Sequence, residues 1–397
     1  MPFYICLLSL VLSILLQISH AAVPDWVTYP GEKWEWLTAD EAGLKQTEWD
    51  NYIAANAGPS SCGGDIHTGN RWGTCVQRGG YMLHCWGNPD CYFQSASLGK
   101  AFNGFVLQLA IDKGLVTGAE HITDVWPDCP SHCGDRSTLD NLFRMKGGFA
   151  TSNGFSDGCD NTKCTSGDKY SSGGMWRLMQ ALTYVFNKDL KDVLDEELFS
   201  KIGIKPDAWY LMSGEEVHSN NPPPNAVPEQ KSFYPSWTSD TKWYGCFVDP
   251  PYKVRGHIVR GGGGWALITP KDLCRVGLLL ASGGYWDGKK LITKTFRVTG
   301  HAGCGNSDLK ATGGTQYFAW GRVSTNSVSF PSSNLIKGEV AIKKHRRATE
   351  AQSHSSPHCV LFTGHANAAG SQALYDILGR RAKHPGIRVG IYIVDFR

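Results

Sequence analysis

The chain has 397 residues, a net charge of +3 and 19% charged residues, and these values exclude several classes of protein. With 46 glycines and 41% hydrophobic residues, the composition suits a compact, loop-rich protein and not a disordered one. A charge this close to neutral gives no indication of a nucleic-acid partner. The densest basic run, residues 343–347, is interpreted as a solvated loop. The length allows one large domain or two small ones.

The first 21 residues have the layout of a secretory signal peptide. An apolar run from Leu7 to Leu16 is followed by the small residues Ser19 and Ala21, which suits cleavage after Ala21. No Lys or Arg precedes the apolar run, so the match is incomplete, and a membrane anchor is the alternative. The run is too short to span a bilayer comfortably, and no later segment resembles a span. We therefore expect a secreted or periplasmic protein without a stable membrane span.

Cysteine usage also indicates export. Cys6 lies in the leader, so twelve of the 13 cysteines remain after its removal, and an even number in an exported chain indicates disulfides. Zinc is the alternative at Cys129-Pro-Ser-His-Cys133, although this spacing fits no standard ligand pattern well. Cys274 falls inside a predicted helix and is a candidate free buried thiol. Spacing does not determine the full connectivity, but three pairs are close enough to staple local loops: Cys85/Cys91, Cys129/Cys133 and Cys159/Cys164.

The first half of the chain contains two predicted helices and a strand. After an aromatic, extended lead, a capping box at Thr38–Glu41 predicts a helix through about Ala55. Residues 80–86 have the composition of a strand. Apolar residues spaced by three and four from Leu98 predict a buried helix that ends near Gly114. Residues 117–130 and 131–166 are predicted as loops.

The second half begins with helices and ends with strands. Helices are predicted from Ser172 to Phe186 and from Leu190 to about Ile202, and residues 220–228 form a proline-rich connector. Thr269-Pro270-Lys271-Asp272 supplies an N-cap, a proline at the first helical position and an acid, so a further helix should run to Gly283. Strands are predicted for residues 317–323, 359–362, 371–378 and 388–396.

The order of these elements predicts an α+β architecture, in which an antiparallel sheet built from both chain ends packs against helices. We expect residues 22–130 and 230–397 to form the sheet part of one domain. Residues 131–229 would form a mainly helical and loop-rich part of the same domain. No internal repeat or low-complexity tail interrupts this pattern.

Ser97 and Lys100 are the first candidate functional residues. They lie three positions apart at the start of a predicted helix, so they share a face, and the lysine nitrogen can reach the serine oxygen. Burial lowers the pKa of a lysine toward that of a usable base, and a serine hydroxyl needs such a base to become a nucleophile. The motif is short enough to occur by chance, however. An N-cap serine followed by a solvated lysine is the alternative.

Three motifs resemble the boxes of the serine β-lactamase and penicillin-binding-protein superfamily, closest to its class C and β-lactamase-related esterase branch. Ser97-Leu-Gly-Lys100 resembles the Ser-x-x-Lys nucleophile box. Tyr170-Ser-Ser172 resembles the Tyr-x-Asn/Ser box, which also opens a helix. The stretch from Gly261 to Leu273 resembles the family's glycine loop and the capped helix after it. The boxes occur in the family's order, and the resemblance covers the chain from about residue 40 to residue 396.

The resemblance implies a β-lactamase/transpeptidase-like fold and a serine hydrolase that cleaves a carboxylic ester or amide. Ser97 would form the acyl-enzyme, and Lys100 would accept or relay its proton. Tyr170 would act as general base and then as general acid, with a pKa lowered by neighbouring cations. On its own, Tyr170 is equally well explained as a hydrogen-bonded core tyrosine. This chemistry requires no metal and no cofactor.

The family's Lys-Thr-Gly or His-x-Gly box is best matched at Gly364-His365-Ala-Asn367-Ala368. His365 would be a further catalytic residue, unless it is merely structural. The backbone N–H of Ser97, with that of Asn367 or Ala368, would form the oxyanion hole, and Ser172 would lie in the same substrate region.

Two departures from the family pattern, at Asn367 and at the end of the chain, keep other functions open. Asn367 stands where glycine is usual, and its side chain would crowd the oxyanion region. Residues 310–314 are a rival for the same box, and the chain stops at Arg397 without the family's final helix. The alternatives are a D-amino-acid peptidase or β-lactamase within the same class, and a non-catalytic binding or scaffold protein that kept the fold. The expected partner is a small or peptide-like ester or amide, and the sequence does not set the oligomeric state.

Overall fold

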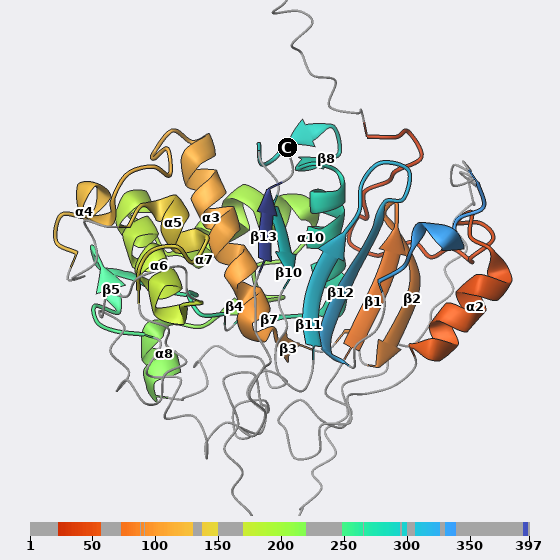
Figure 1. Ribbon diagram of the computed structural model, residues 1–397, viewed down its shortest axis with the longest axis horizontal. Helices are drawn as coiled ribbons and strands as arrows, with labels where there is room; N and C mark the ends of the chain where they lie inside the picture. The colour runs from red at the N-terminus through yellow and green to blue at the C-terminus, as the bar shows by residue number, and fades with distance from the viewer. Residues whose placement is uncertain are drawn as a thin grey trace, which may run out of the picture.

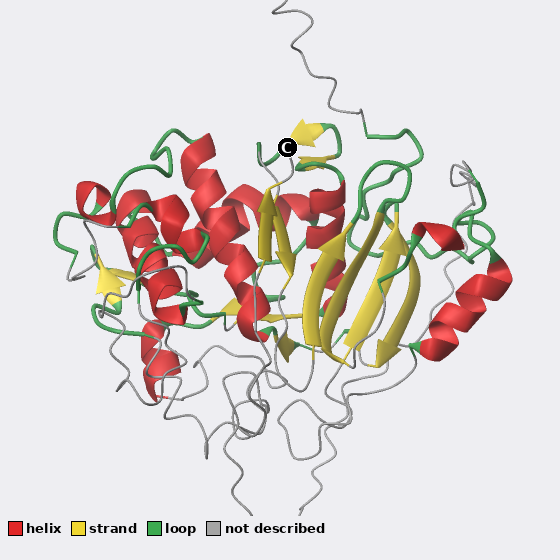
Figure 2. Ribbon diagram, in the orientation of Figure 1, coloured by secondary structure: helices red, strands yellow, loops and turns green. Residues whose placement is uncertain are grey.

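A computed structural model describes most of the chain. Two groups of elements are visible: a twisted sheet on one side and a bundle of helices on the other (Figures 1 and 2). The predicted α+β architecture is therefore confirmed. The predicted leader, the proline-rich connector and the predicted strands 359–362 and 371–378 lie outside the described residues. The described residues are 23–56, 73–87, 89–90, 92–129, 137–149, 170–219, 248–264, 266–293, 296–299, 306–325, 330–338 and 392–395.

Four antiparallel strands form the main sheet in the order β11-β12-β1-β2. β1 (Gly73–Arg78) and β2 (Tyr81–Gly87) form a hairpin, and β12 (Phe318–Thr325) pairs with the free edge of β1. β11 (Asn306–Ala311) pairs in turn with β12. Strands that lie far apart in the sequence are thus neighbours, as predicted. β2 and β12 confirm the predicted strands, whereas β11 was missed because Asn, Ser, Asp and Lys dominate it.

Two helices form the centre of the helical side. α3 (Lys100–Asp112) follows one 3-10 turn, η1 (Ala96–Gly99), and the backbone of Gly114 takes a φ of +67° just after it. α6 (Ser172–Phe186) packs beside α3. Both predicted helices are confirmed. The predicted apolar stripe of α3 is fully within the main core: Ala101, Phe102, Phe105, Val106, Leu109 and Ala110.

A third helix, α10 (Pro270–Ala281), packs against one face of the sheet. The hydroxyl of Thr269 accepts a hydrogen bond from the N–H of Asp272 at 3.1 Å, which confirms the predicted N-cap. The approach to β12 depends on Gly321, because a Cβ there would lie 2.2 Å from the carbonyl oxygen of Pro270. The capped helix is therefore held within backbone contact of the sheet.

A two-stranded ribbon lies between α3 and the main sheet (Figure 1). β10 (Phe296–Thr299) pairs antiparallel with β13 (Tyr392–Asp395), and β10 lies beside β11. The last predicted strand is thus confirmed over residues 392–395. A smaller three-stranded sheet has the order β3-β7-β4, and its strands are β3 (Phe93–Gln94), β7 (Ala266–Ile268) and β4 (Tyr210–Leu211).

α2 (Gln46–Ala55) lies beside the sheet on the side away from the helical bundle (Figure 1). The predicted capping box forms, with Glu41 accepting from the N–H of Thr38 at 2.9 Å, but the residues after it make turns, and the helix begins only at Gln46. The remaining helices are α4 (Ile122–Val125), α5 (Leu139–Phe143), α7 (Leu190–Leu194) with its continuations η4 (Asp195–Phe199) and η5 (Ser200–Ile202), α8 (Gly214–Ser219) and η8 (Ser333–Leu335).

Two corrections concern the loops. α4 and α5 fall in segments predicted as loops, because four- and five-residue helices are too short to show a helical period. Two small hairpins were also not predicted, and their strands are β5 (Lys253–Val254), β6 (His257–Ile258), β8 (Tyr285–Trp286) and β9 (Lys289–Lys290). No helix in the described ranges is long and apolar enough to cross a membrane.

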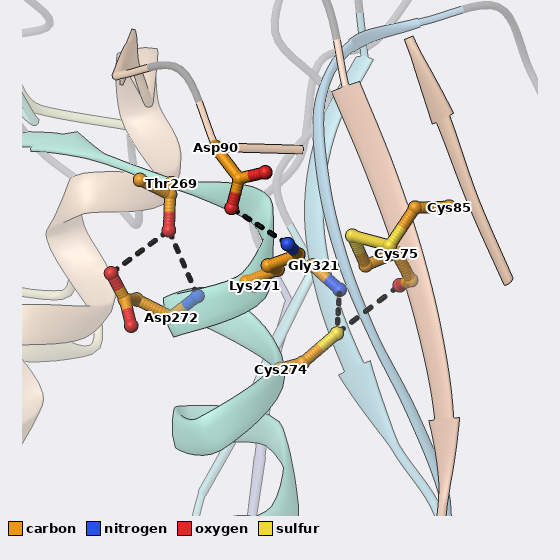
Figure 3. The surroundings of a disulfide bond; sticks show 8 residues. All are labelled: Cys75, Cys85, Asp90, Thr269, Lys271, Asp272, Cys274 and Gly321. Carbon is orange, nitrogen blue, oxygen red and sulfur yellow. Dashed lines mark hydrogen bonds and ion pairs between the residues drawn. A yellow bond between two sulfur atoms is a disulfide. The ribbon is translucent and has the colours of Figure 1, made fainter. Parts of the chain in front are cut away.

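The disulfide in the described part of the chain joins Cys75 to Cys85 across the β1–β2 hairpin (Figure 3). The predicted pair Cys85/Cys91 is therefore wrong, because Cys75 and Cys85 are direct partners in the strand register with Cα atoms 4.2 Å apart. Cys274 is a buried free thiol, as predicted. Cys133 and the pair Cys159/Cys164 lie outside the described residues, so the other two predicted pairs and the zinc alternative stay untested.

Candidate active site

Ser97, Lys100 and Tyr170 form a closed triangle of hydrogen bonds. The Ser97 and Tyr170 hydroxyl oxygens lie 2.6 Å apart. The amine of Lys100 donates to Ser97 Oγ at 3.1 Å and to Tyr170 Oη at 2.8 Å. Lys100 is only 1% exposed, so the alternative of a solvated lysine beside an N-cap serine is wrong. The structure brings together the nucleophile box and the tyrosine box that the sequence predicted.

Local structure sets the position of each member of the triangle. Ser97 lies in η1 and Lys100 opens α3, so the two side chains are one turn apart. The N–H of Ser95 donates to the carbonyl of Ala266 at 2.7 Å, which anchors η1 to β7. Tyr170 immediately precedes the capped start of α6, where the hydroxyl of Ser171 accepts from the N–H of Gly174 at 2.9 Å. The N-terminal ends of α3 and α6 therefore meet at the hydrogen-bonded triangle.

The glycine loop, residues 261–264, closes one side of this site. Gly261 and Gly262 have φ values of +81° and +87°, a conformation that other residues rarely adopt. A Cβ on Gly99 would lie 2.8 Å from the carbonyl carbon of Gly264, so the loop packs directly on the nucleophile turn. The carbonyl of Gly263 accepts a hydrogen bond from the amine of Lys100. The glycine box predicted from the sequence thus contributes a backbone acceptor to the site.

Burial controls the protonation of Lys100. Loss of hydration lowers the pKa of its amine well below the ordinary value of 10.5. The three groups that accept hydrogen bonds from the nitrogen, two hydroxyls and a carbonyl, are uncharged and so give the ammonium no ionic partner. A neutral amine still fits this environment, because it has two donors and one lone pair. It can donate to Gly263 and to one hydroxyl while it accepts from the other.

The lowered pKa expected for the phenol of Tyr170 is wrong. Burial raises the pKa of its phenol to about 12, and hydrogen bonds to the hydroxyls of Ser97 and Ser172 offset this only in part. A neighbouring ammonium would lower this pKa, but burial disfavours the charged form of Lys100 as well. Tyr170 is therefore a protonated phenol at neutral pH. Ser172, the buried first residue of α6, lies next to the tyrosine, and its place in a substrate region stays a prediction.

The predicted strand box is not among these groups. His365, Asn367 and Ala368 lie outside the described residues, so their assignment stays a prediction. The rival box at residues 310–314 is wrong. Lys310 Nζ lies 4.7 Å from the ring centroid of Phe330, and a Cβ on Gly313 would lie 2.9 Å from the carbonyl oxygen of Ala281. The β11–β12 turn that contains Gly313 therefore lies at the C-terminal end of α10. η1, in contrast, is anchored to β7, which immediately precedes the N-terminal end of α10.

A better match to the His-x-Gly pattern was missed in the sequence. Gly300-His301-Ala302-Gly303 separates β10 from β11 and lies outside the described residues. Thr293, shortly before β10, donates from its N–H to Asp112 at 2.9 Å, at the far end of α3, and β11 lies beside η1. The pattern was detectable because it directly precedes a strand hairpin.

Comparison with known proteins gives a likeness in fold. No protein-family model matches the chain, and no curated protein matches its sequence. FmtA from Staphylococcus aureus is similar with a TM-score of 0.43 and 10% identity, over 76% of this chain and 87% of its own. The D-amino acid amidase from Ochrobactrum anthropi SV3 has a TM-score of 0.40 and 15% identity, with coverages of 68% and 89%.

A third similar structure is the D-alanine carboxypeptidase AmpC from Burkholderia cenocepacia, with a TM-score of 0.38, 14% identity and coverages of 57% and 65%. These neighbours all belong to the serine β-lactamase and penicillin-binding-protein superfamily. It is the superfamily that the sequence motifs resemble. At these identities the likeness concerns the fold, so the chemistry has to come from the contacts of Ser97, Lys100 and Tyr170.

Proposed function

We propose that this protein is a serine hydrolase that cleaves a carboxylic ester or amide through an acyl-enzyme on Ser97. The supporting observation is the hydrogen-bonded triangle of Ser97, Lys100 and Tyr170. A serine hydroxyl becomes a nucleophile when a neighbouring base removes its proton, and the buried amine of Lys100, 3.1 Å away and with a lowered pKa, is such a base once it is neutral.

The proposed reaction moves one proton around the triangle. As Ser97 Oγ bonds to the carbonyl carbon, its proton passes to the amine of Lys100. The resulting ammonium donates to Gly263 O and to Tyr170 Oη, which accept hydrogen bonds from this nitrogen. Tyr170 gives its own proton to the departing alkoxide or amine as the C–O or C–N bond breaks, and takes another from Lys100. Water then attacks the acyl-enzyme by the reverse sequence.

The cost of burying Lys100 favours an enzyme over a scaffold protein. A lysine amine with no ionic partner destabilises the fold relative to an apolar side chain of similar size. Groups with strongly perturbed pKa values that also contact a nucleophile are characteristic of catalytic sites. The natural substrate, and the choice between ester, amide and β-lactam, are open within the proposal.

Two further features belong to this proposal. His301 is a second candidate for the strand box beside the predicted His365, because its segment lies between β10 and β11 in the sequence, and β11 lies beside η1. Export is supported by the Cys75–Cys85 disulfide, since disulfides persist in oxidising compartments.

A covalent probe tests the proposed nucleophile. The purified protein is treated with a fluorophosphonate, and the adduct is located by mass spectrometry of its peptides. We expect one adduct on Ser97, none in Ser97→Ala, and labelling slowed by about a hundredfold in Tyr170→Phe. A folded protein that shows no adduct on Ser97 would refute the enzyme hypothesis. Short-chain nitrophenyl esters, matched nitroanilides and nitrocefin then separate esterase, amidase and β-lactamase activity.

A further inference from the structure

Asn103 is a buried polar residue with no role in the proton transfers proposed above. It lies one turn after Lys100 on the same face of α3 and is 0% exposed. Its side chain neither titrates nor reacts, so sequence motifs give no reason to select it. Its contacts, however, lead directly to the glycine loop.

The carboxamide of Asn103 holds both backbone groups of one residue. Its Nδ2 donates to the carbonyl of Gly262 at 2.7 Å, and its Oδ1 accepts from the N–H of Gly262 at 3.4 Å. This pair of hydrogen bonds resembles the pairing between two β-strands, with the carboxamide of Asn103 in place of the backbone of one strand. The loop is further confined at this point, because a Cβ on Gly262 would lie 2.9 Å from Cα of Trp176. Gly262 is therefore fixed between α3 and α6.

The next residue of the loop is Gly263, whose carbonyl accepts from the amine of Lys100. The peptide unit between Gly262 and Gly263 thus links the carboxamide of Asn103 to the carbonyl that holds the amine of Lys100, the base of the proposed mechanism. A carbonyl that holds one N–H of a neutral amine also fixes the direction of its lone pair. If Gly262 moved, the carbonyl of Gly263 would lose the fixed backbone one residue before it, and the direction of the lysine lone pair would be held less tightly.

We propose that Asn103 is a positioning residue that acts through Gly262 to hold the carbonyl of Gly263 against Lys100, and so orients the lysine amine toward Ser97. This inference rests on the proposed function of Ser97. It adds a residue that touches no reacting atom and predicts that the loop backbone takes part in setting the protonation of the base.

The test compares Asn103 with Gln180, a buried carboxamide that makes the same kind of contact elsewhere. Gln180 on α6 is 0% exposed, and its Nε2 donates to the carbonyls of Asp249 at 2.9 Å and Pro251 at 2.8 Å. Asn103→Leu, Asn103→Ser and Gln180→Leu are prepared, and their folding is measured by thermal unfolding. The rate of fluorophosphonate labelling of Ser97 is then measured from pH 5 to pH 10.

In the wild-type protein the rate should rise with pH as Lys100 loses its proton. Both Asn103 variants should label about tenfold more slowly at the plateau. Their pH midpoint should fall by about one unit, because an ammonium that has lost a carbonyl acceptor gives up its proton more readily. Gln180→Leu should lose thermal stability and keep both the midpoint and the plateau.

Two outcomes would overturn the inference. Folded Asn103 variants with the wild-type midpoint and plateau rate would show that the hydrogen bonds between Asn103 and Gly262 are only structural. The same shift in Gln180→Leu would show that any buried carboxamide has this effect. If Asn103→Leu does not fold, Asn103→Ser decides, since serine is smaller than asparagine and is still polar, but cannot make both hydrogen bonds to Gly262. A wild-type protein that is never labelled would instead refute the proposed function itself.

Discussion

Among the buried side chains that can carry positive charge, Lys100 has 1% and Arg275 has 2% of its surface exposed, and the two have different partners. Arg275, on α10, donates to the backbone carbonyls of Pro30, Gly31 and Ile202 at 2.9, 2.7 and 3.2 Å, and its Nε lies 3.5 Å from a carboxylate oxygen of Asp272. These contacts fasten the N-terminal lead and the end of η5 to α10. A guanidinium does not lose its proton in proteins, and backbone carbonyls cannot accept one.

Lys100 has partners of a different kind. Two of its three acceptors are hydroxyls, which can both give and take protons, and the amine itself can be neutral. Burial of a cation therefore does not by itself identify an active site. The identity of the partners separates a structural anchor from a centre that can move protons.

Removal of the lysine amine should have the largest effect. Lys100→Met keeps most of the side-chain volume and leaves Ser97 without a base, so labelling of Ser97 should slow by about 10⁴-fold while the protein stays folded. The labelling rate at pH 8 and the circular dichroism spectrum measure the two parts of this prediction. A variant that reacts within tenfold of the wild-type rate would contradict the role of Lys100.

Removal of the arginine should have the opposite pattern. Arg275→Met leaves Asp272 without its cationic partner and several carbonyls without donors. The free energy of unfolding should therefore fall by about 3–5 kcal/mol, as measured by denaturant titration. The labelling rate of the molecules that remain folded should stay within a few-fold of wild type. A large loss of rate with little loss of stability would remove the distinction between the two cations.

A paired substitution decides which histidine completes the site. His301→Ala should slow labelling of Ser97 by about a hundredfold, because the segment that contains His301 precedes a strand beside η1. His365→Ala serves as the matched control and should leave the rate unchanged. The reverse result would restore the box first predicted at residues 364–368.

The smallest effect concerns stability and pH. The pKa of Lys100 is lower in the folded protein than its ordinary value of 10.5, so the unfolded chain binds more protons between the two values. Stability therefore rises with pH in this window and is lost as pH falls toward the folded pKa. The wild-type protein should gain up to ~1.4 kcal/mol per pH unit relative to Lys100→Met, as measured by urea unfolding at pH 7, 8 and 9. Parallel pH profiles would mean that burial does not perturb this amine.

Sequence periodicity and capping signals were enough to predict α3, α6 and α10, because each is a local pattern. The resemblance also selected Ser97, Lys100 and Tyr170 correctly as groups that meet. Properties that depend on contacts between distant segments could not be predicted. The pKa of Tyr170 follows from the burial of its neighbours, and the Cys75–Cys85 pairing follows from the register of a hairpin. Asn103 bonds to a residue 159 positions away, which no local motif could indicate.

The central claim is that Ser97 carries an acyl group during turnover, and mass spectrometry of peptides from the acid-quenched protein tests it directly. The wild-type protein and Ser97→Ala are mixed with nitrophenyl acetate, quenched in acid within seconds and digested for peptide mapping. The account predicts one acetyl group on the wild-type protein, located on the peptide that contains Ser97, and none at that position in the variant. Ester cleavage by the wild-type protein with no acetyl group on Ser97, or with equal turnover by Ser97→Ala, would contradict it.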